Sequence, residues 1–245
     1  MNGGEAPRRL AIVTGASRGL GEVIAEYLAG AGFDLIITAR GEQALEAAAT
    51  RFRQFGVSVR PLPGAVESPG HRAQLAEAVR ARGALHILVN NASELGEGAL
   101  PPLVTYPLPA WRRVLEVNLL APVALVQDLA PYLRAGAGLV VNLSSDAAVG
   151  AYPGWGAYGA SKAALDLASR TLAAELATSG VTVVSVDPGD MRTAMHQSAF
   201  PHQDISDRPL PGATLPFWVW LFGQPPRSVN GARLRAQAER WEVAA

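Results

Sequence analysis

A tyrosine and a lysine four residues apart are the most chemically distinctive pair in this chain. Lys162 is the only lysine among 21 basic residues, and it ends the segment Tyr158-Gly-Ala-Ser-Lys162. Residues at this spacing share one face of a helix, so both side chains would reach one site. A neighbouring ammonium favours the phenolate and would lower the pKa of Tyr158 from about 10. The pair predicts a proton-transferring tyrosine, although a lone lysine on a solvated helix face would show the same spacing.

A glycine-rich loop near the N-terminus has the composition of a phosphate-binding loop. The strand-like run Leu10–Thr14 leads into Gly15-Ala-Ser-Arg-Gly19-Leu-Gly21, and a helical pattern follows. Glycines let the backbone approach a pyrophosphate, and the N-terminus of the next helix offers free N–H groups. The spacing is G-x-x-x-G-x-G and not the commoner G-x-G-x-x-G, so an ordinary tight turn is the alternative for this motif alone.

Six motifs in a fixed order resemble the short-chain dehydrogenase/reductase family. They are Thr14-Gly-Ala-Ser-Arg-Gly-Leu-Gly21, Asn90-Asn-Ala92, Asn118, Ser145, Tyr158-x-x-x-Lys162 and Pro188-Gly189-x-x-x-Thr193. The match runs from about residue 8 to residue 235. The resemblance implies an enzyme that interconverts a carbonyl compound and its alcohol by hydride transfer with a nicotinamide cofactor.

The resemblance also implies a role for each catalytic residue. Tyr158 would be the acid or base, and Lys162 would lower its pKa and bind the cofactor ribose. Ser145, 13 residues before Tyr158, would hold the substrate oxygen, whereas adjacent Ser144 would face the other way. Asn118 would interrupt a helix from about residue 109 to 133 and hold a water for proton supply.

A cofactor site is expected along the loops that follow the strands. Besides Tyr158 and Lys162 it would contain Gly15, Ser17, Arg18, Gly19, Leu20, Gly21, Arg40, Ala65, Val66, Asn91, Ala92, Ser93, Pro188, Gly189, Met191 and Thr193. Arg18 and Arg40 would face the adenosine ribose, where two guanidiniums suit a 2′-phosphate. The expected cofactor is therefore NADP(H), with NAD(H) as the alternative. Ala65 is a departure, because the family usually has Asp-Val in this segment against the adenine.

Apolar and aromatic residues are expected to form the substrate wall around Tyr158. The candidates are Leu95, Ala147, Tyr152, Trp155, Met195 and Phe200. Such walls, with only Ser145 and Tyr158 to hold one oxygen, predict a neutral, hydrophobic carbonyl substrate. Arg192 is the one cation that could bind a carboxylate, but it is expected to face the cofactor phosphates or solvent. A 3-oxoacyl thioester reductase is the nearest alternative, and a non-catalytic dinucleotide-binding sensor is the alternative of another class.

Alternating strand and helix patterns must position these residues. They predict an α/β fold of one domain over residues 1–245, a Rossmann-type doubly wound parallel sheet of about seven strands with helices on both faces. The expected strands are Leu10–Thr14, Asp34–Ala39, Val57–Leu62, Leu85–Asn90, Gly138–Ser144, Val181–Asp187 and Ala232–Arg235. Residues 194–215 are expected to form a variable substrate lid and residues 236–245 a C-terminal tail. The aromatic run at 217–222 is expected to pack on the sheet.

Composition narrows the possible partners. The net charge is zero, so neither nucleic acid nor an anionic membrane surface is expected to bind. The chain has no cysteine, which excludes disulfides and thiolate catalysis. No metal site is expected, because the histidines lack the spacing of a helical zinc site; they are His71, His86, His196 and His202. With no secretory signal or run of about 18 apolar residues, the expected location is cytoplasmic.

Small and apolar residues recur every four positions on the helix that carries Lys162. They are Ala160, Ala164, Ala168, Leu172 and Leu176. Small side chains at this spacing let another helix approach closely. Together with the family resemblance, this stripe predicts a homo-oligomer, a tetramer or a dimer. The alternative is that the stripe covers only the chain's own sheet.

Overall fold

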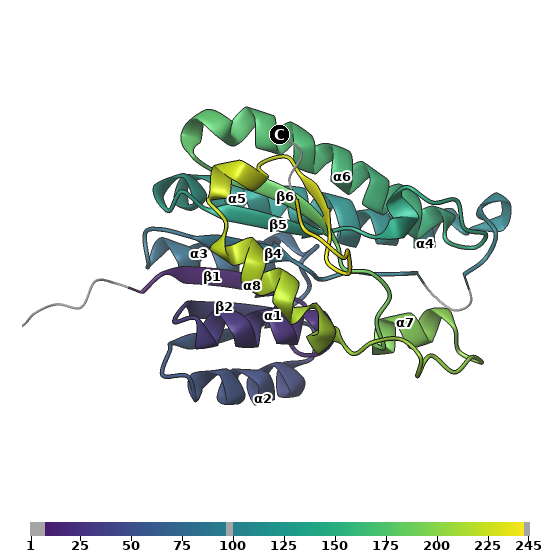
Figure 1. The fold of residues 1–245 in the computed structure, drawn as a ribbon, viewed down its shortest axis with the longest axis horizontal. Helices are drawn as coiled ribbons and strands as arrows, with labels where there is room; N and C mark the ends of the chain where they lie inside the picture. The colour runs from purple at the N-terminus through teal and green to yellow at the C-terminus, as the bar shows by residue number, and fades with distance from the viewer. Residues whose placement is uncertain (1–7, 97–99, 243–245) are drawn as a thin grey trace, which may run out of the picture.

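Seven strands form one parallel sheet in the computed structural model, which describes residues 8–96 and 100–242. Their order is β3-β2-β1-β4-β5-β6-β7 (Figure 1). The strands are β1 (Leu10–Thr14), β2 (Asp34–Ala39), β3 (Val59–Pro63), β4 (Ile87–Asn90), β5 (Leu139–Leu143), β6 (Thr182–Asp187) and β7 (Arg233–Arg235). The order reverses between β1 and β4, and ligands of such sheets bind beyond the carboxyl ends at this point. The predicted doubly wound fold is confirmed, whereas residues 1–7, 97–99 and 243–245 of the expected domain and tail lie outside the described residues.

Helices cover both faces of the sheet, each over its own hydrophobic cluster. One face carries α1 (Gly19–Gly30), α2 (Glu42–Arg53) and α8 (Leu215–Gly223). The other carries α3 (Pro69–Arg80), α4 (Leu108–Leu115), α5 (Ala121–Ala135) and α6 (Gly156–Leu176). The short α7 (Ala194–Ala199) lies beyond the carboxyl ends of the strands, at the right of Figure 1. The inner strands β1, β4, β5 and β6 are buried along their whole length and mostly apolar because both faces are covered, whereas the edge strands β3 and β7 are partly exposed.

Some predicted strand ends differ from the observed ones by one or two residues. The fourth strand begins at Ile87 and not at Leu85, because the Leu85 N–H bonds to the Tyr132 carbonyl of α5 instead of a neighbouring strand. The third strand begins at Val59 and not at Val57, because its pairing with β2 begins where Val59 lies opposite Leu35. A ladder extends only where the partner strand is present.

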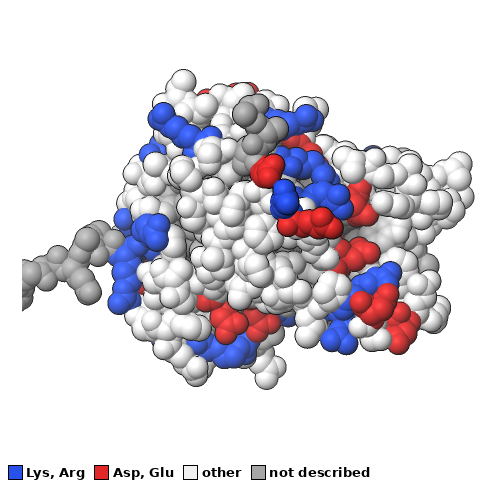
Figure 2. All heavy atoms as spheres, in the orientation of Figure 1, with Lys and Arg blue, Asp and Glu red and all other residues white. Residues whose placement is uncertain are grey.

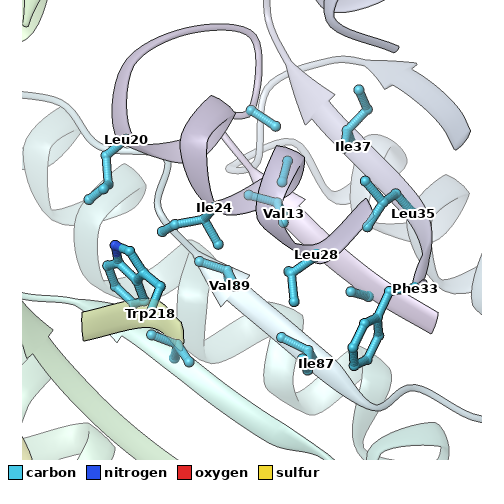
Figure 3. Close-up of a cluster of buried hydrophobic side chains, with 14 of the residues drawn as sticks. Val13, Leu20, Ile24, Leu28, Phe33, Leu35, Ile37, Ile87, Val89 and Trp218 are labelled. Carbon is cyan, nitrogen blue, oxygen red and sulfur yellow. The ribbon is translucent and has the colours of Figure 1, made fainter. Parts of the chain in front are cut away.

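The aromatic run at 217–222 forms α8 and packs on the sheet as predicted. Trp218 is fully buried and lies near Ile24 of α1 and Val89 of β4 (Figure 3). Its indole N–H donates to Thr214 Oγ1 at 2.9 Å, which satisfies the polar end of a buried ring. This segment is therefore part of the core beside α1, the helix that follows the glycine-rich loop.

A long helix from Leu108 to Ala135 is interrupted by a π-helical turn. The turn spans Glu116–Leu120 and holds Asn118, which is fully buried. Among the described residues, this is the one helix long and apolar enough to span a membrane by length and composition. Leu125, Leu129 and Leu133 belong to the hydrophobic cluster under the sheet, and a core helix passes the same test. The predicted interruption lies at Asn118, and π turns occur frequently at functional sites.

Charged side chains of both signs are interspersed on the face of the molecule shown in Figure 2. Acidic and basic groups pair at several places on the surface, for example Arg51 with Glu22 and Arg53 with Glu46. Such exposed pairs contribute little to stability.

Candidate active site

Two adjoining cavities open at the carboxyl ends of the strands. The larger, the cofactor cleft, has a volume of about 810 Å³ and runs from the Gly15–Gly21 loop past Arg40 to Tyr158. The smaller, the substrate cavity, has a volume of about 390 Å³. Both are lined by Ser144, Tyr158, Pro188, Met191, Thr193 and Met195. Tyr158 therefore lies where a molecule in one cavity would meet a molecule in the other.

Backbone geometry explains the glycines of the first loop. Gly15 and Gly19 have φ values of +67° and +65°, which side chains with a Cβ rarely adopt. A Cβ on Gly21 would lie 2.4 Å from the Gly15 carbonyl oxygen, so this residue permits the tight packing of loop on helix. The amide of Asn91 braces the loop by donating to the Thr14 carbonyl at 2.9 Å. Because α1 begins at Gly19, its free N–H groups lie at the cleft.

All the predicted cofactor residues line the cleft except Gly21 and Gly189. Gly21 lies behind the loop, and Gly189 lines the substrate cavity, where a Cβ would meet the Gln237 side chain at 2.7 Å. The cleft also contains residues that the sequence interpretation missed, including Glu22, Glu67, Glu94, Leu210 and Gly212. The three glutamates directly follow predicted cofactor residues in the sequence, and this adjacency was the signal that could have identified them.

Arginines gather at the adenosine end of the cleft. Arg18 and Arg40 both line it, and Arg40 Nη1 lies 3.4 Å from Glu94 Oε2. The Arg40 side chain is 64% exposed, so this pair is a weak surface contact that a phosphate can replace. Arg192 also lines the cofactor cleft and not the substrate cavity. The substrate cavity has no arginine or lysine among its described lining residues.

Burial dominates the acidity of the catalytic pair. It raises the pKa of Tyr158 to about 12, against the opposing hydrogen bonds with Ser93 and Ser145. Burial also lowers the pKa of Lys162 to about 8, partly opposed by Asp166. Burial therefore outweighs the expected lowering of the tyrosine pKa in this structure. Lys162 Nζ lies 5.5 Å from the tyrosine ring centre and donates to the Leu143 carbonyl at 2.7 Å, so its charge is close to the ring while its N–H is directed at the backbone.

Two adjacent serines face the cavities in different ways. Ser145 lines the substrate cavity, where its hydroxyl donates to Asp146 Oδ1 at 3.0 Å and accepts from the Ala147 N–H at 3.2 Å. Ser144 was expected to face away, but it lines both cavities, and its buried hydroxyl has no hydrogen-bond partner among the described residues. The prediction failed because β5 ends at Leu143, so the alternation of strand side chains does not extend to these serines.

Asn118 clamps the loop that follows β4. Its Oδ1 accepts from the Glu94 N–H at 2.8 Å and the Ser93 hydroxyl at 3.1 Å. Its Nδ2 donates to the Glu94 carbonyl at 2.8 Å and the Ser161 hydroxyl at 3.0 Å. These four bonds use the whole capacity of the amide. The side chain therefore has no capacity left for the water that the family resemblance implies.

The predicted substrate wall is assembled in one cavity. It includes Leu95, Ala147, Tyr152, Trp155, Met195 and Phe200. The ring of Trp155 lies edge-on to Tyr158 with centres 5.7 Å apart, and 6.0 Å from the centre of Phe200. This aromatic wall gives a flat apolar ligand a large contact area beside the tyrosine hydroxyl.

Carboxylates also line the substrate cavity, beside the Ser145 and Tyr158 that were expected to hold the substrate oxygen. Three aspartates and one histidine were missed, namely Asp146, Asp187, Asp190 and His196. Burial raises the pKa of Asp187, opposed by the Gly189 N–H and by Arg233. Asp190 lies 3.9 Å from both His196 and Arg208. Asp146 and Asp187 adjoin predicted residues in sequence, which was the signal that could have found them.

No group of three or more His, Cys, Asp or Glu side chains in residues 8–96 and 100–242 is placed to hold a metal ion. His71 instead bonds to Thr38 at 2.7 Å in the core, and His86 accepts from the Leu10 N–H at 3.1 Å. His196 lines the substrate cavity.

Comparison with known proteins shows that this chain is similar to oxidoreductases. The family model for short chain dehydrogenases matches residues 9–204. The chain is 37% identical to the rhamnolipids biosynthesis 3-oxoacyl-[acyl-carrier-protein] reductase of Pseudomonas aeruginosa over 194 residues, 76% of this chain and 74% of the relative. It is 32% identical to the uncharacterized oxidoreductase YciK of Escherichia coli over 243 residues, 95% of this chain and 93% of YciK.

Solved structures show the same architecture. A short chain dehydrogenase of Shigella flexneri complexed with NADP has a TM-score of 0.87 and 31% identity, covering 94% of this chain and 97% of that one. A short chain dehydrogenase of Escherichia coli CFT073 complexed with NADPH has a TM-score of 0.86 and 31% identity, with coverage of 94% and 97%.

Proposed function

Because this chain belongs to the short-chain dehydrogenase/reductase family, we propose that it uses NADP(H) to interconvert a neutral, hydrophobic carbonyl compound and its alcohol. The observation that carries this proposal is the position of Tyr158 at the junction of the two cavities. A hydroxyl at that junction reaches both a carbonyl oxygen in the substrate cavity and a cofactor in the cleft. The bound cofactor would supply or accept the hydride.

Three side chains of this protein would carry out the proton transfer and bind the substrate oxygen. In the reductive direction Tyr158 donates a proton to the carbonyl oxygen, and the Ser145 hydroxyl binds the same oxygen. To do so, Ser145 turns its hydrogen bond from Asp146 to the substrate. Lys162 keeps a positive charge near the tyrosine at neutral pH, because its pKa of about 8 lies above that pH. That charge stabilises the phenolate left by proton donation.

The cleft fits an NADP(H) molecule on two observations. A Cβ on Gly15 would lie 2.7 Å from the Asn91 amide and 3.1 Å from the Ala92 Cα, so only glycine lets the loop pack on the segment after β4 while its backbone lines the cleft. At the other end, Arg18 and Arg40 would hold the 2′-phosphate. The complexes of similar enzymes with NADP and NADPH support this choice.

We expect NADPH to bind more tightly than NADH, and replacement of Arg18 and Arg40 by alanine to remove most of the difference. A charge-assisted pair with phosphate contributes roughly 1.5–3 kcal/mol, or about ten- to a hundredfold in affinity. Fluorescence titration of both cofactors with the wild type and the variants measures this. Equal dissociation constants in the wild type would contradict the assignment.

The acidic groups in the substrate cavity favour a substrate without a negative charge. Asp146, Asp187 and Asp190 would repel a carboxylate, and Arg192 lies in the other cavity. A 3-oxoacyl thioester reductase remains a second candidate, favoured by the similarity to the Pseudomonas aeruginosa reductase. A non-catalytic sensor has no need for Ser145, Tyr158 and Lys162 together where the two cavities meet.

A panel of ketones, aldehydes, keto acids and 3-oxoacyl thioesters with NADPH tests the substrate class. We expect bulky neutral ketones or aldehydes to give a higher kcat/KM than small keto acids. Replacement of Trp155 by alanine should weaken the bulky substrates most, because it removes the ring between Tyr158 and Phe200. Preference for keto acids, with activity lost in Arg192→Ala but not in Trp155→Ala, would reverse this view.

We also propose a homo-oligomer, a tetramer or a dimer, in the cytoplasm. On α6 the predicted stripe is only partly on the surface, because Ala160 is exposed, Ala164 and Ala168 are half-buried and Leu176 is buried. Leu167 on the same helix is 59% exposed, which a second helix would cover. We expect light scattering to show more than one copy at micromolar concentration. A monomer at that concentration would reject the proposal.

A further inference from the structure

The last strand brings one arginine to the base of the candidate active site. Arg233 lies on β7, paired with Ser185 of β6. Its Nη2 donates to the Ser145 carbonyl oxygen at 2.7 Å, and its Nε donates to Asp166 Oδ2 at 2.8 Å. Asp187 Oδ2 lies 3.7 Å from the same guanidinium. One side chain thus joins the ends of β5 and β6 to α6.

Each partner of Arg233 is next to a group that the proposed reaction uses. Ser145 supplies the hydroxyl for the substrate oxygen. Asp166 lies one helical turn after Lys162 on α6. The Asp187 carboxylate accepts the Gly189 N–H at 3.0 Å and so holds the loop at the junction of the two cavities. A shift of Arg233 would therefore move the surroundings of the reacting atoms.

Charge gives a second reason for an arginine at this position. The side chains of Asp166 and Asp187 are only 9% and 5% exposed, and a buried carboxylate is costly without a partner. The guanidinium of Arg233 serves both and still has an N–H for the Ser145 carbonyl. The compact ammonium of a lysine could not contact both carboxylates and the carbonyl oxygen at once, because it lacks the extended planar array of donors.

We propose that Arg233 is a positioning residue that acts through Ser145, by fixing the Ser145 backbone so that its hydroxyl meets the substrate oxygen. This inference rests on the proposed carbonyl–alcohol reaction and adds to it a residue from the C-terminal strand. Arg233 lines neither cavity, so its effect on the reaction passes through the residues that it holds.

A double-mutant cycle in the full chain tests the inference, with the best carbonyl substrate of the panel and NADPH. We expect Arg233→Met to lower kcat/KM by roughly ten- to a hundredfold, the scale for misplaced reacting groups. Ser145→Ala should lower it at least as much. The double variant should be no slower than Ser145→Ala alone, because residues that act as one unit are not additive. The dissociation constant of NADPH should change little, since its phosphate contacts lie in the other part of the cleft.

Two controls separate positioning from folding. Arg233→Lys keeps a charge beside both carboxylates, so it should stay folded by thermal melting and still lose about tenfold in kcat/KM. Arg235→Met removes the same charge from the same strand, where the side chain is exposed, and should keep nearly wild-type rates. Fully additive losses in the cycle, or wild-type rates in Arg233→Lys, would overturn the inference alone. A wild type that oxidises no NADPH with any carbonyl compound would overturn the proposed function and the inference together.

Discussion

Replacement of Tyr158 by phenylalanine should lower turnover by about 10²-fold or more, the scale of general acid catalysis. The variant loses one hydroxyl and keeps the ring, which packs at 73° to the ring of Trp155. The pKa of Tyr158, about 12, means that the hydroxyl carries its proton at neutral pH and is ready to donate it in the reductive direction. NADPH consumption with an active carbonyl substrate measures the loss.

Binding of NADPH provides the control for this variant. The adenosine end of the cleft, with Arg18 and Arg40, is remote from the tyrosine, so the dissociation constant should stay near the wild-type value. Trp155→Phe is a matched aromatic change in the same wall that leaves the acid in place, and it should retain turnover far better. Near wild-type turnover of the phenylalanine variant would remove Tyr158 from the proposed reaction.

The fold was predictable because its signals are local and repeated. The inner strands are short apolar runs separated by helical patterns, and a parallel sheet with both faces covered is the arrangement that buries them. Strand ends were less predictable. Leu85 has the composition of a strand residue, but its N–H is bonded to Tyr132 of a helix far along the chain.

The lining of the two cavities was predictable where motifs carry it. The glycine loop, the segment after β4 and the tyrosine–lysine pair all meet at one edge of the sheet, as parallel strands require. Local periodicity failed at Ser144, which comes after the end of β5 and lines both cavities. The ammonium of Lys162 was expected near the tyrosine oxygen, but its bond to Leu143 depends on the packing of α6 against β5.

The contacts of Arg233 could not have been predicted from sequence spacing. Ser145, Asp166 and Asp187 stand 88, 67 and 46 residues away along the chain, and the pairing of β7 with β6 brings them to one guanidinium. Nothing in the local sequence around a three-residue edge strand distinguishes this arginine from Arg235. The charge balance of the substrate cavity is therefore a tertiary property.

Replacement of Lys162 by methionine should also lower turnover by about 10²-fold, because the positive charge that stabilises the phenolate is lost. Lys162→Arg should be severe as well, since the longer planar fork cannot take the position of a fully enclosed ammonium. Both variants are assayed with NADPH and an active carbonyl substrate. Rates near the wild type in either would contradict the role of this residue.

The same methionine variant should show a characteristic dependence of stability on pH. The pKa of Lys162 is about 8 in the folded chain and 10.5 in the reference state, so the unfolded chain binds the proton more tightly. The cost of burying the charge is therefore full below pH 8 and falls as the pH rises toward 10.5. From pH 7 to 9.5 the wild type should gain about 2 kcal/mol in free energy of unfolding relative to Lys162→Met.

Urea denaturation of both proteins at the two pH values measures this difference, and equal pH dependence would show that the lysine is not held in a costly, charged state. A gain in relative stability at high pH together with the loss of turnover would show that the chain accepts a less stable fold to keep this charge beside Tyr158.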